Sequence, residues 1–145
     1  MKIEVSNGEL LDKYTILQIK CERITDTDKL AHAEHERQAL MIHAQQLIGE
    51  YPTVIPMIDE LKQVNMKLWD IEDRLREFED RREFTREFAE WARLVYMTND
   101  KRAQIKRKIN AHTKSEFHEV KSYAHANDTE IYGKILFMLP EDDGA

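Results

Sequence analysis

The chain has 145 residues, a length typical of one domain with enough residues to bury a core. Charged residues make up 34% of it and the net charge is −6, so the whole molecule should repel nucleic acid and anionic lipid. A single cysteine, Cys21, excludes an internal disulfide and a cysteine-based zinc site, and it fits a reducing, cytoplasmic setting. No apolar run approaches the roughly 18 residues of a membrane span, so we predict no membrane partner.

The first predicted helix begins after Ser6. Lys2 to Val5 alternate polar and apolar residues and are interpreted as a short extended lead-in. Ser6 and Glu9 then have the spacing of a capping box, in which the Ser6 hydroxyl accepts a hydrogen bond from the Glu9 amide. Up to Ile24, one helix face is apolar, formed by Leu10, Tyr14, Leu17, Cys21 and Ile24. Cys21 is therefore interpreted as a small buried hydrophobe and not as a reactive thiol.

A second helix is predicted from about Asp28 to Ile48, with Gly49 as its C-terminal cap. Its apolar face is thin, so we expect it to cover the other helices. His32, His35 and Glu36 are three and four residues apart and could converge on a metal ion, but their order matches no zinc motif. We interpret them as an exposed helix face and predict no metal and no cofactor.

The longest pattern runs from about Thr53 to His112 and predicts two helices folded back on each other around a turn at Arg81 to Thr85. Its apolar residues alternate at spacings of four and three: Met57, Leu61, Val64, Leu68, Ile71, Leu75 and Phe78, then Phe84, Phe88, Trp91, Val95, Ile105 and Ile109. If Phe78 faces Phe88 across the turn, the register follows for the whole hairpin. That register also places opposite charges side by side, in the pairs Asp73 with Arg93, Glu60 with Lys106 and Asp59 with Arg107.

Thr98 and Arg102 interrupt this apolar pattern. One interpretation is a paired polar layer that fixes the register, with Asn65 and Glu72 as the nearest partners of Arg102. The other is an open cleft in which Arg102 and a neighbouring lysine bind an anionic ligand, with Glu72 or Asp73 as acid or base. The candidate residues are Arg102, Arg93, Lys13, Glu72, Asn65, Asn99 and Trp69, of which Lys13 is included because the first helix must cover the hairpin.

Basic residues between Lys101 and Lys114 could also be interpreted as a nucleic-acid surface. They lie toward the end of a helix, where the dipole favours cations, and no aromatic residues alternate with them. We therefore predict no nucleic-acid partner.

After His112 the pattern weakens. A short helix is predicted from Ser115 to Lys121, and a compact apolar segment follows at Ile131 to Leu139. An apolar segment left in water would be a binding or aggregation surface, so we expect it to pack on the bundle or on a second subunit. The expected organisation is one helical domain over residues 1–123 and a tail over 124–145.

Several motifs carry a family resemblance. They are Glu4-Val-Ser-Asn-Gly-Glu-Leu-Leu-Asp-Lys13, Asn65-x-x-Leu-Trp-x-Ile-Glu-Asp-Arg74, Ala92-Arg-x-Val-Tyr-x-Thr-Asn-Asp-x-Arg-Ala-x-Ile-Lys-Arg107 and Val120-Lys-Ser-Tyr123. Together they resemble an uncharacterised family of short bacterial and phage proteins, the domain of unknown function DUF6165, over about residues 3 to 123. The resemblance implies a cytoplasmic, free-standing helical protein and no particular chemistry, and the tail after Ala124 departs from it.

The sequence thus predicts an all-α helical bundle built on a long antiparallel hairpin, with two N-terminal helices packed on it. Two functional classes stay open. The first is a non-catalytic interaction or regulatory module that forms a homo-oligomer or binds another protein. The second is a small all-helical enzyme, or a binder of an anionic small molecule, that uses the charged residues around Arg102 and Glu72.

Overall fold

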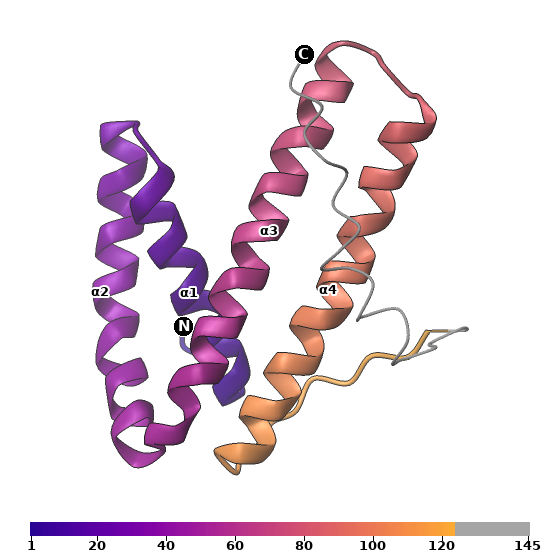
Figure 1. Ribbon diagram of the computed structural model, residues 1–145. Helices are drawn as coiled ribbons and strands as arrows, with labels where there is room; N and C mark the ends of the chain where they lie inside the picture. The colour runs from indigo at the N-terminus through magenta and orange to yellow at the C-terminus, as the bar shows by residue number, and fades with distance from the viewer. Residues whose placement is uncertain (124–145) are drawn as a thin grey trace. The chain divides into compact units, whose positions relative to one another are not determined.

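The computed structural model describes residues 1–123, which fold into four α-helices and one short 3-10 helix (Figure 1). In chain order these are α1 (Asn7–Arg23), α2 (Thr27–Glu50), η1 (Pro52–Val54), α3 (Ile55–Asp80) and α4 (Arg86–His112). No strand occurs in this range, so the predicted all-α helical bundle is confirmed. None of the helices within it is long and apolar enough to cross a membrane. The apolar segment at 131–139 lies outside the described residues.

Most helix ends follow from local sequence. Ser6 caps α1 by accepting a hydrogen bond from the Glu9 amide at 3.1 Å, as predicted. Thr85, at the end of the predicted turn, accepts a hydrogen bond from the Phe88 amide at 3.4 Å at the start of α4. The predicted cap at Gly49 is wrong, because α2 continues through it to Glu50 and is capped by Tyr51. Pro52, which lacks an amide hydrogen, forces the helix to end there instead.

The ends of α3 and α4 share one geometry. Arg82 and Lys114 adopt left-handed backbone conformations, with φ of 54° and 52°. Beyond α4, the Ser115 amide donates to the Asn110 carbonyl at 2.9 Å, which closes a Schellman motif and turns the chain away. The predicted helix from Ser115 to Lys121 is therefore wrong: this stretch is irregular and leaves Phe117 and Val120 exposed to solvent.

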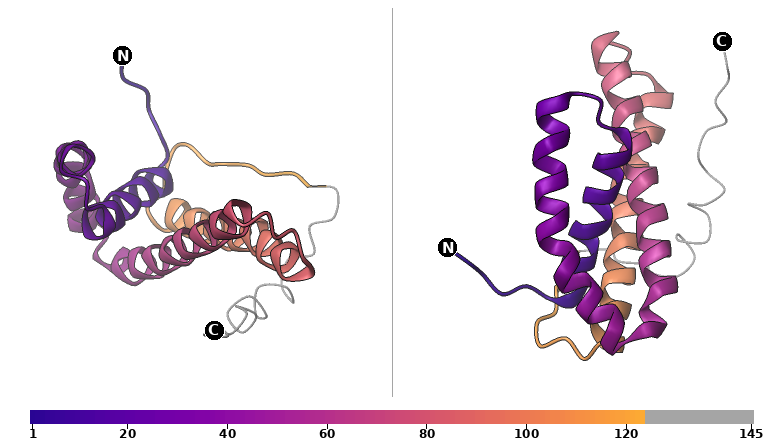
Figure 2. Two further views of the ribbon diagram at one scale, coloured as in Figure 1. Left: turned by 90° about the horizontal axis from the view of Figure 1, so that it is seen from above. Right: turned by 90° about the vertical axis from the view of Figure 1, so that its left-hand side faces the viewer.

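The chain divides into two compact units, and α3 and α4 each contribute to both. Unit 1 comprises residues 1–65 and 102–120. In it α1 and α2 lie side by side (Figure 2) and pack on the first part of α3 and the last part of α4. Its buried core consists of Leu11, Ala44, Leu47, Val54, Ile58, Leu61, Val64, Ile105 and Ile109. The two N-terminal helices thus cover this part of the hairpin, as expected.

Unit 2 contains the hairpin turn and residues 66–101. The Phe78 and Phe88 rings meet edge to face with centroids 6.0 Å apart, which confirms the pairing from which the register was derived. Their cluster also buries Ile71, Trp91 and Leu94. Phe84, expected in the apolar series, lies in the turn instead and is 55% exposed.

Helix α1 approaches α4 closely at Gly8. A Cβ atom at this position would lie 2.6 Å from the Lys106 carbonyl oxygen and 2.9 Å from Asn110 Oδ1, well inside van der Waals contact. The absence of a side chain is therefore what allows the start of α1 to lie directly on α4.

We expect Gly8→Ala to lower the free energy of unfolding by about 1 to 3 kcal/mol, because α1 must move away from α4. Gly49→Ala is the matched control: nothing lies within 4 Å of its added Cβ, so it should stabilise α2 by about 0.4 to 1 kcal/mol. Urea unfolding followed by circular dichroism measures both. Equal effects at the two glycines would contradict the close approach.

Candidate functional site

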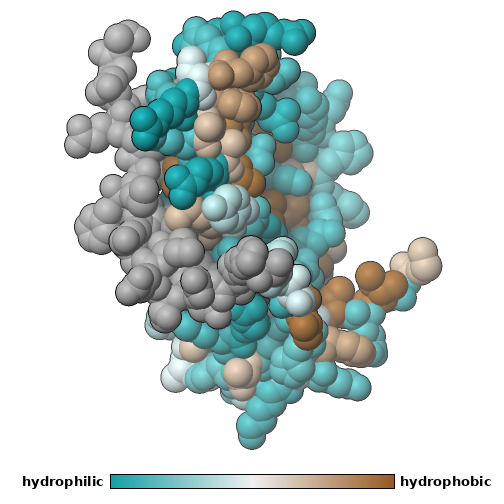
Figure 3. Space-filling view, turned by 90° about the vertical axis from the view of Figure 1, so that its right-hand side faces the viewer, coloured by the Kyte–Doolittle hydropathy of each residue, from teal (hydrophilic) through white to brown (hydrophobic). Residues whose placement is uncertain are grey.

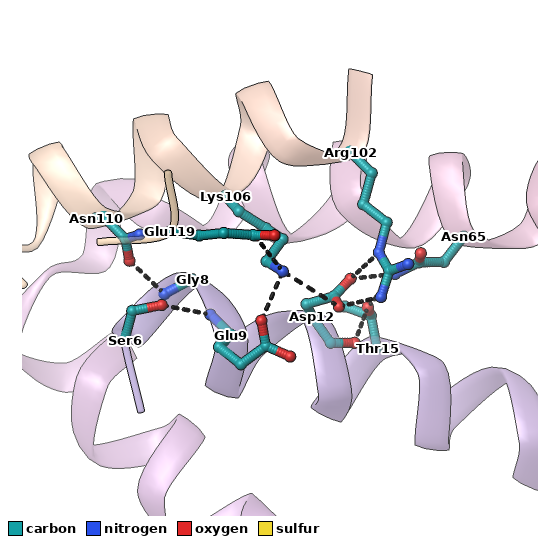
Figure 4. Close-up of polar contacts among 10 residues, drawn as sticks. All are labelled: Ser6, Gly8, Glu9, Asp12, Thr15, Asn65, Arg102, Lys106, Asn110 and Glu119. Atoms are coloured by element: carbon teal, nitrogen blue, oxygen red, sulfur yellow. Dashed lines mark hydrogen bonds and ion pairs between the residues drawn. The ribbon is translucent and has the colours of Figure 1, made fainter. Parts of the chain in front are cut away.

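Charged residues of α1 and α4 face each other inside unit 1 (Figure 4). Glu9 and Asp12 are three residues apart on α1, and Arg102 and Lys106 are four apart on α4, so each pair lies on one helix face. With Glu119, these residues form what we call the charged centre.

The best-buried group of the charged centre is the Asp12 carboxylate, which is 1% exposed. Arg102 Nε donates to Asp12 Oδ1 at 2.8 Å, and Arg102 Nη2 donates to Asp12 Oδ2, which makes the pair bidentate. Asn65 Nδ2 donates to Asp12 Oδ1 and to Thr15 Oγ1, both at 2.9 Å. The hydrogen bond with Asp12 raises the pKa of Arg102 more than partial burial lowers it. The buried carboxylate is thus fully matched by donors.

Lys106 is the second cation of the charged centre. Its Nζ lies 2.6 Å from Glu9 Oε2, 2.9 Å from Glu119 Oε2 and 4.0 Å from Asp12 Oδ2, and its side chain is only 8% exposed. Burial is the largest single influence on the pKa of Lys106 and would lower it. The hydrogen bonds to Glu9 and Glu119 and the charge of Asp12 outweigh burial, so the net pKa is raised.

The first turn of α1 is held by the end of α4. The Gly8 amide donates to Asn110 Oδ1 at 2.7 Å, and Asn7 donates from its amide to Ser115 Oγ and from Nδ2 to Thr113 Oγ1, both at 3.0 Å. A helix N-terminus binds anions when its amides are free. Here those amides donate to side chains of the protein, so this end of α1 is already satisfied.

Three of the residues predicted for the site lie in unit 1. Arg102 and Asn65 both bind Asp12, and Lys13 lies outside the charged centre, where it pairs with Glu36 at 2.8 Å on the surface. Asp12 was not predicted. The signal for it was present, because the two acids of α1 have the helical spacing that complements the two bases of α4.

The other four predicted residues, Glu72, Trp69, Arg93 and Asn99, belong to unit 2. The Glu72 carboxylate lies 3.9 Å from Arg76 Nη2, one helical turn away. A joint role of these residues with Arg102 stays a prediction. The predicted pairing of Lys106 with Glu60 also stays a prediction. The ion pairs that the structure shows at Lys106 are those with Glu9, Asp12 and Glu119.

The candidate metal ligands and Cys21 were compared with their surroundings in the described part of the chain. Within residues 1–123, no three histidine, cysteine or carboxylate groups lie close enough together to hold a metal ion. Glu36, considered beside His32 and His35, instead pairs with Lys13, and that hydrogen bond lowers its pKa. Burial, followed by the charge of Glu34, raises the pKa of the Cys21 thiol, which disfavours the reactive thiolate.

Sequence comparison gives the family. The profile of a family of unknown function, DUF6165, matches residues 1–133. The chain belongs to DUF6165. The match extends beyond the predicted range of 3 to 123, so the expectation that the chain departs from the family after Ala124 is wrong up to residue 133. No curated protein and no solved structure matches the chain significantly. Membership of DUF6165 brings no ligand or reaction with it, so the function has to be inferred from the geometry.

In this DUF6165 protein, we expect Asp12→Asn to lower the free energy of unfolding by about 3 kcal/mol, because Arg102 loses its buried counter-charge. Glu36→Gln, which removes a carboxylate from an exposed pair, should cost at most about 1 kcal/mol. Chemical denaturation compares the two variants. Combining Asp12→Leu with Arg102→Met should recover most of the loss, since neither buried charge then remains. Equal losses for Asp12→Asn and Glu36→Gln would contradict a structural role for the charged centre.

The raised pKa of Lys106 predicts a stability change in alkali. Its contribution should be complete below the unfolded lysine pKa of about 10.4 and should disappear as the pH rises through the higher folded pKa. The difference in unfolding free energy between wild type and Lys106→Met should therefore shrink above about pH 10.4. Urea unfolding over a pH series measures it, with Lys108→Met at an exposed α4 position as control. A difference that stays constant across the series would contradict the prediction.

Proposed function

We propose that this protein is a non-catalytic interaction module that self-associates, and that its charged centre fixes the helices in place and does not bind a ligand. The observation that carries the proposal is the bidentate pair between Arg102 and the buried Asp12. Arg102 was the residue on which an anion site would have depended.

The charge balance of the centre supports this. Two cations, Arg102 and Lys106, are surrounded by three carboxylates, those of Glu9, Asp12 and Glu119. An incoming anion would have to displace a carboxylate already held at hydrogen-bonding distance, and the remaining carboxylates would repel it. The arrangement is that of a structural network with its own counter-ions.

The apolar surface of unit 1 supports an interaction role. Large hydrophobic side chains are exposed at the start of the chain and after α4, namely Met1, Ile3, Val5, Phe117 and Val120. Exposed apolar side chains such as these indicate a contact surface for another protein chain more than a site for a small polar molecule.

Two measurements test the proposal. In sedimentation velocity at low to high micromolar protein, the sedimentation coefficient should rise with concentration, as a self-associating chain requires. In a thermal-shift screen with inorganic phosphate, malonate and a nucleoside triphosphate, the midpoint should stay unchanged, whereas a bound ligand at about 100 times its dissociation constant would add roughly 2.7 kcal/mol. A shift that disappears in Arg102→Ala would overturn the proposal in favour of the anion-binding alternative.

A further inference from the structure

We propose that two copies of this chain associate by pairing their first five residues, Met1 to Val5, as antiparallel β-strands. We call this segment the N-terminal arm. The inference rests on the self-association proposed above and names the surface and the partner, a second copy of this chain.

The N-terminal arm is extended, and it pairs with no other segment of the described chain. It projects from unit 1 (Figure 2) and joins α1 at Ser6, whose backbone is itself extended, with φ −66° and ψ 157°. None of the other described residues hydrogen-bonds to the arm, so both of its backbone edges are free within residues 1–123. Free edges of an extended segment are the groups with which another strand pairs.

The apolar residues of the arm are exposed. Met1, Ile3 and Val5 have exposed fractions of 117%, 78% and 46%, and Figure 3 shows hydrophobic side chains along the projecting segment. In an extended chain alternate residues share a face, so these three lie on one face and Lys2 and Glu4 on the other. Within residues 1–123, the arm is thus an amphipathic extended segment without a partner.

The charges of the arm are self-complementary in one register. If two arms pair antiparallel about a twofold axis at Ile3, Lys2 of each copy lies opposite Glu4 of the other. The same register places Ile3 opposite Ile3 and Met1 opposite Val5. A surface that matches itself about a twofold axis closes on two copies and leaves no free end, so it favours a dimer over a filament.

The body of unit 1 provides a cover for the apolar face. An isolated two-stranded ribbon is marginally stable in water, so that face needs a further contact. The Asn7 amide donates a hydrogen bond to Ser115 Oγ at 3.0 Å. Val5 is two residues before Asn7, and Phe117 is two residues after Ser115. Phe117 is 45% exposed. The paired arms would therefore place their apolar face near Phe117 of each copy and leave Lys2 and Glu4 in water.

Charge reversal tests the register. Lys2→Glu places two carboxylates opposite each other in both cross-strand pairs of the dimer, and Glu4→Lys places two ammonium groups there. Each single variant should therefore raise the dimer dissociation constant about tenfold at low salt. The double variant, Lys2→Glu with Glu4→Lys, restores both opposite-charge pairs and should return the constant to near the wild-type value. Mixing the two single variants should form a heterodimer of wild-type strength.

Sedimentation velocity measures the dissociation constants, and circular dichroism checks that each variant is folded. Lys108→Glu is the matched control, because it makes the same charge change at an exposed α4 position of unit 1 that the proposed strand pairing does not involve. It should leave the dissociation constant unchanged.

The outcomes distinguish arm pairing from the self-association on which it rests. If the wild type is a dimer and neither Lys2→Glu nor Glu4→Lys changes its dissociation constant, arm pairing is overturned and self-association must use another surface. Weakening in both single variants without restoration in the double variant would also overturn it, since the arm would then contact something other than a second arm. A wild-type protein that stays monomeric at every concentration would overturn both.

Discussion

The structure of unit 1 depends on one buried carboxylate. Asp12 is almost inaccessible to water, so its charge has to be matched inside the protein, by Arg102 from α4 and Asn65 from α3. An apolar helix face could slide by a turn along its neighbours at modest cost. A helix held by a bidentate ion pair cannot slide in this way, because both hydrogen bonds between Arg102 and Asp12 form in only one relative position of α1 and α4. Asp12 therefore converts a hydrophobic contact between helices into a defined register.

This constraint changes how the charged residues are to be interpreted. Arg102 and Lys106 have the spacing and chemistry of an anion site when they are considered alone. Once α1 is in place, Glu9 and Asp12 occupy the positions that a ligand would take. Large apolar side chains of unit 1 are exposed at its start, at Met1, Ile3 and Val5, and after α4, at Phe117 and Val120.

The fold was largely predictable from local signals. In the charged centre, Arg102 and Asn65 were predicted as candidate residues, but their common partner Asp12 was not. The caps at Ser6 and Thr85 and the meeting of Phe78 with Phe88 depend on residues close in sequence or on a short turn. The buried face of α1 was predicted only in part. Leu17 of the apolar series is buried, and Leu10 and Tyr14 pack half-buried on the core. Asp12, Thr15 and Ile19 lie outside that series and are also buried. Asp12 and Thr15 are polar, and only Arg102 and Asn65, distant in sequence, make their burial favourable. Periodicity within one helix contains no information about such partners.

The start of α1 gives every residue of a short motif a separate task. Ser6 caps the helix, Asn7 binds the end of α4, Gly8 permits the close approach, and Glu9 pairs with Lys106. Gly8, Glu9 and Asp12 meet residues that recur every four positions along α4, namely Asn110, Lys106 and Arg102. The contact can therefore be written as a two-part pattern, Ser-Asn-Gly-Glu-x-x-Asp with a later Arg-x-x-x-Lys-x-x-x-Asn. A distant chain that carries both halves could be assigned this helix crossing even where the rest of its sequence has diverged.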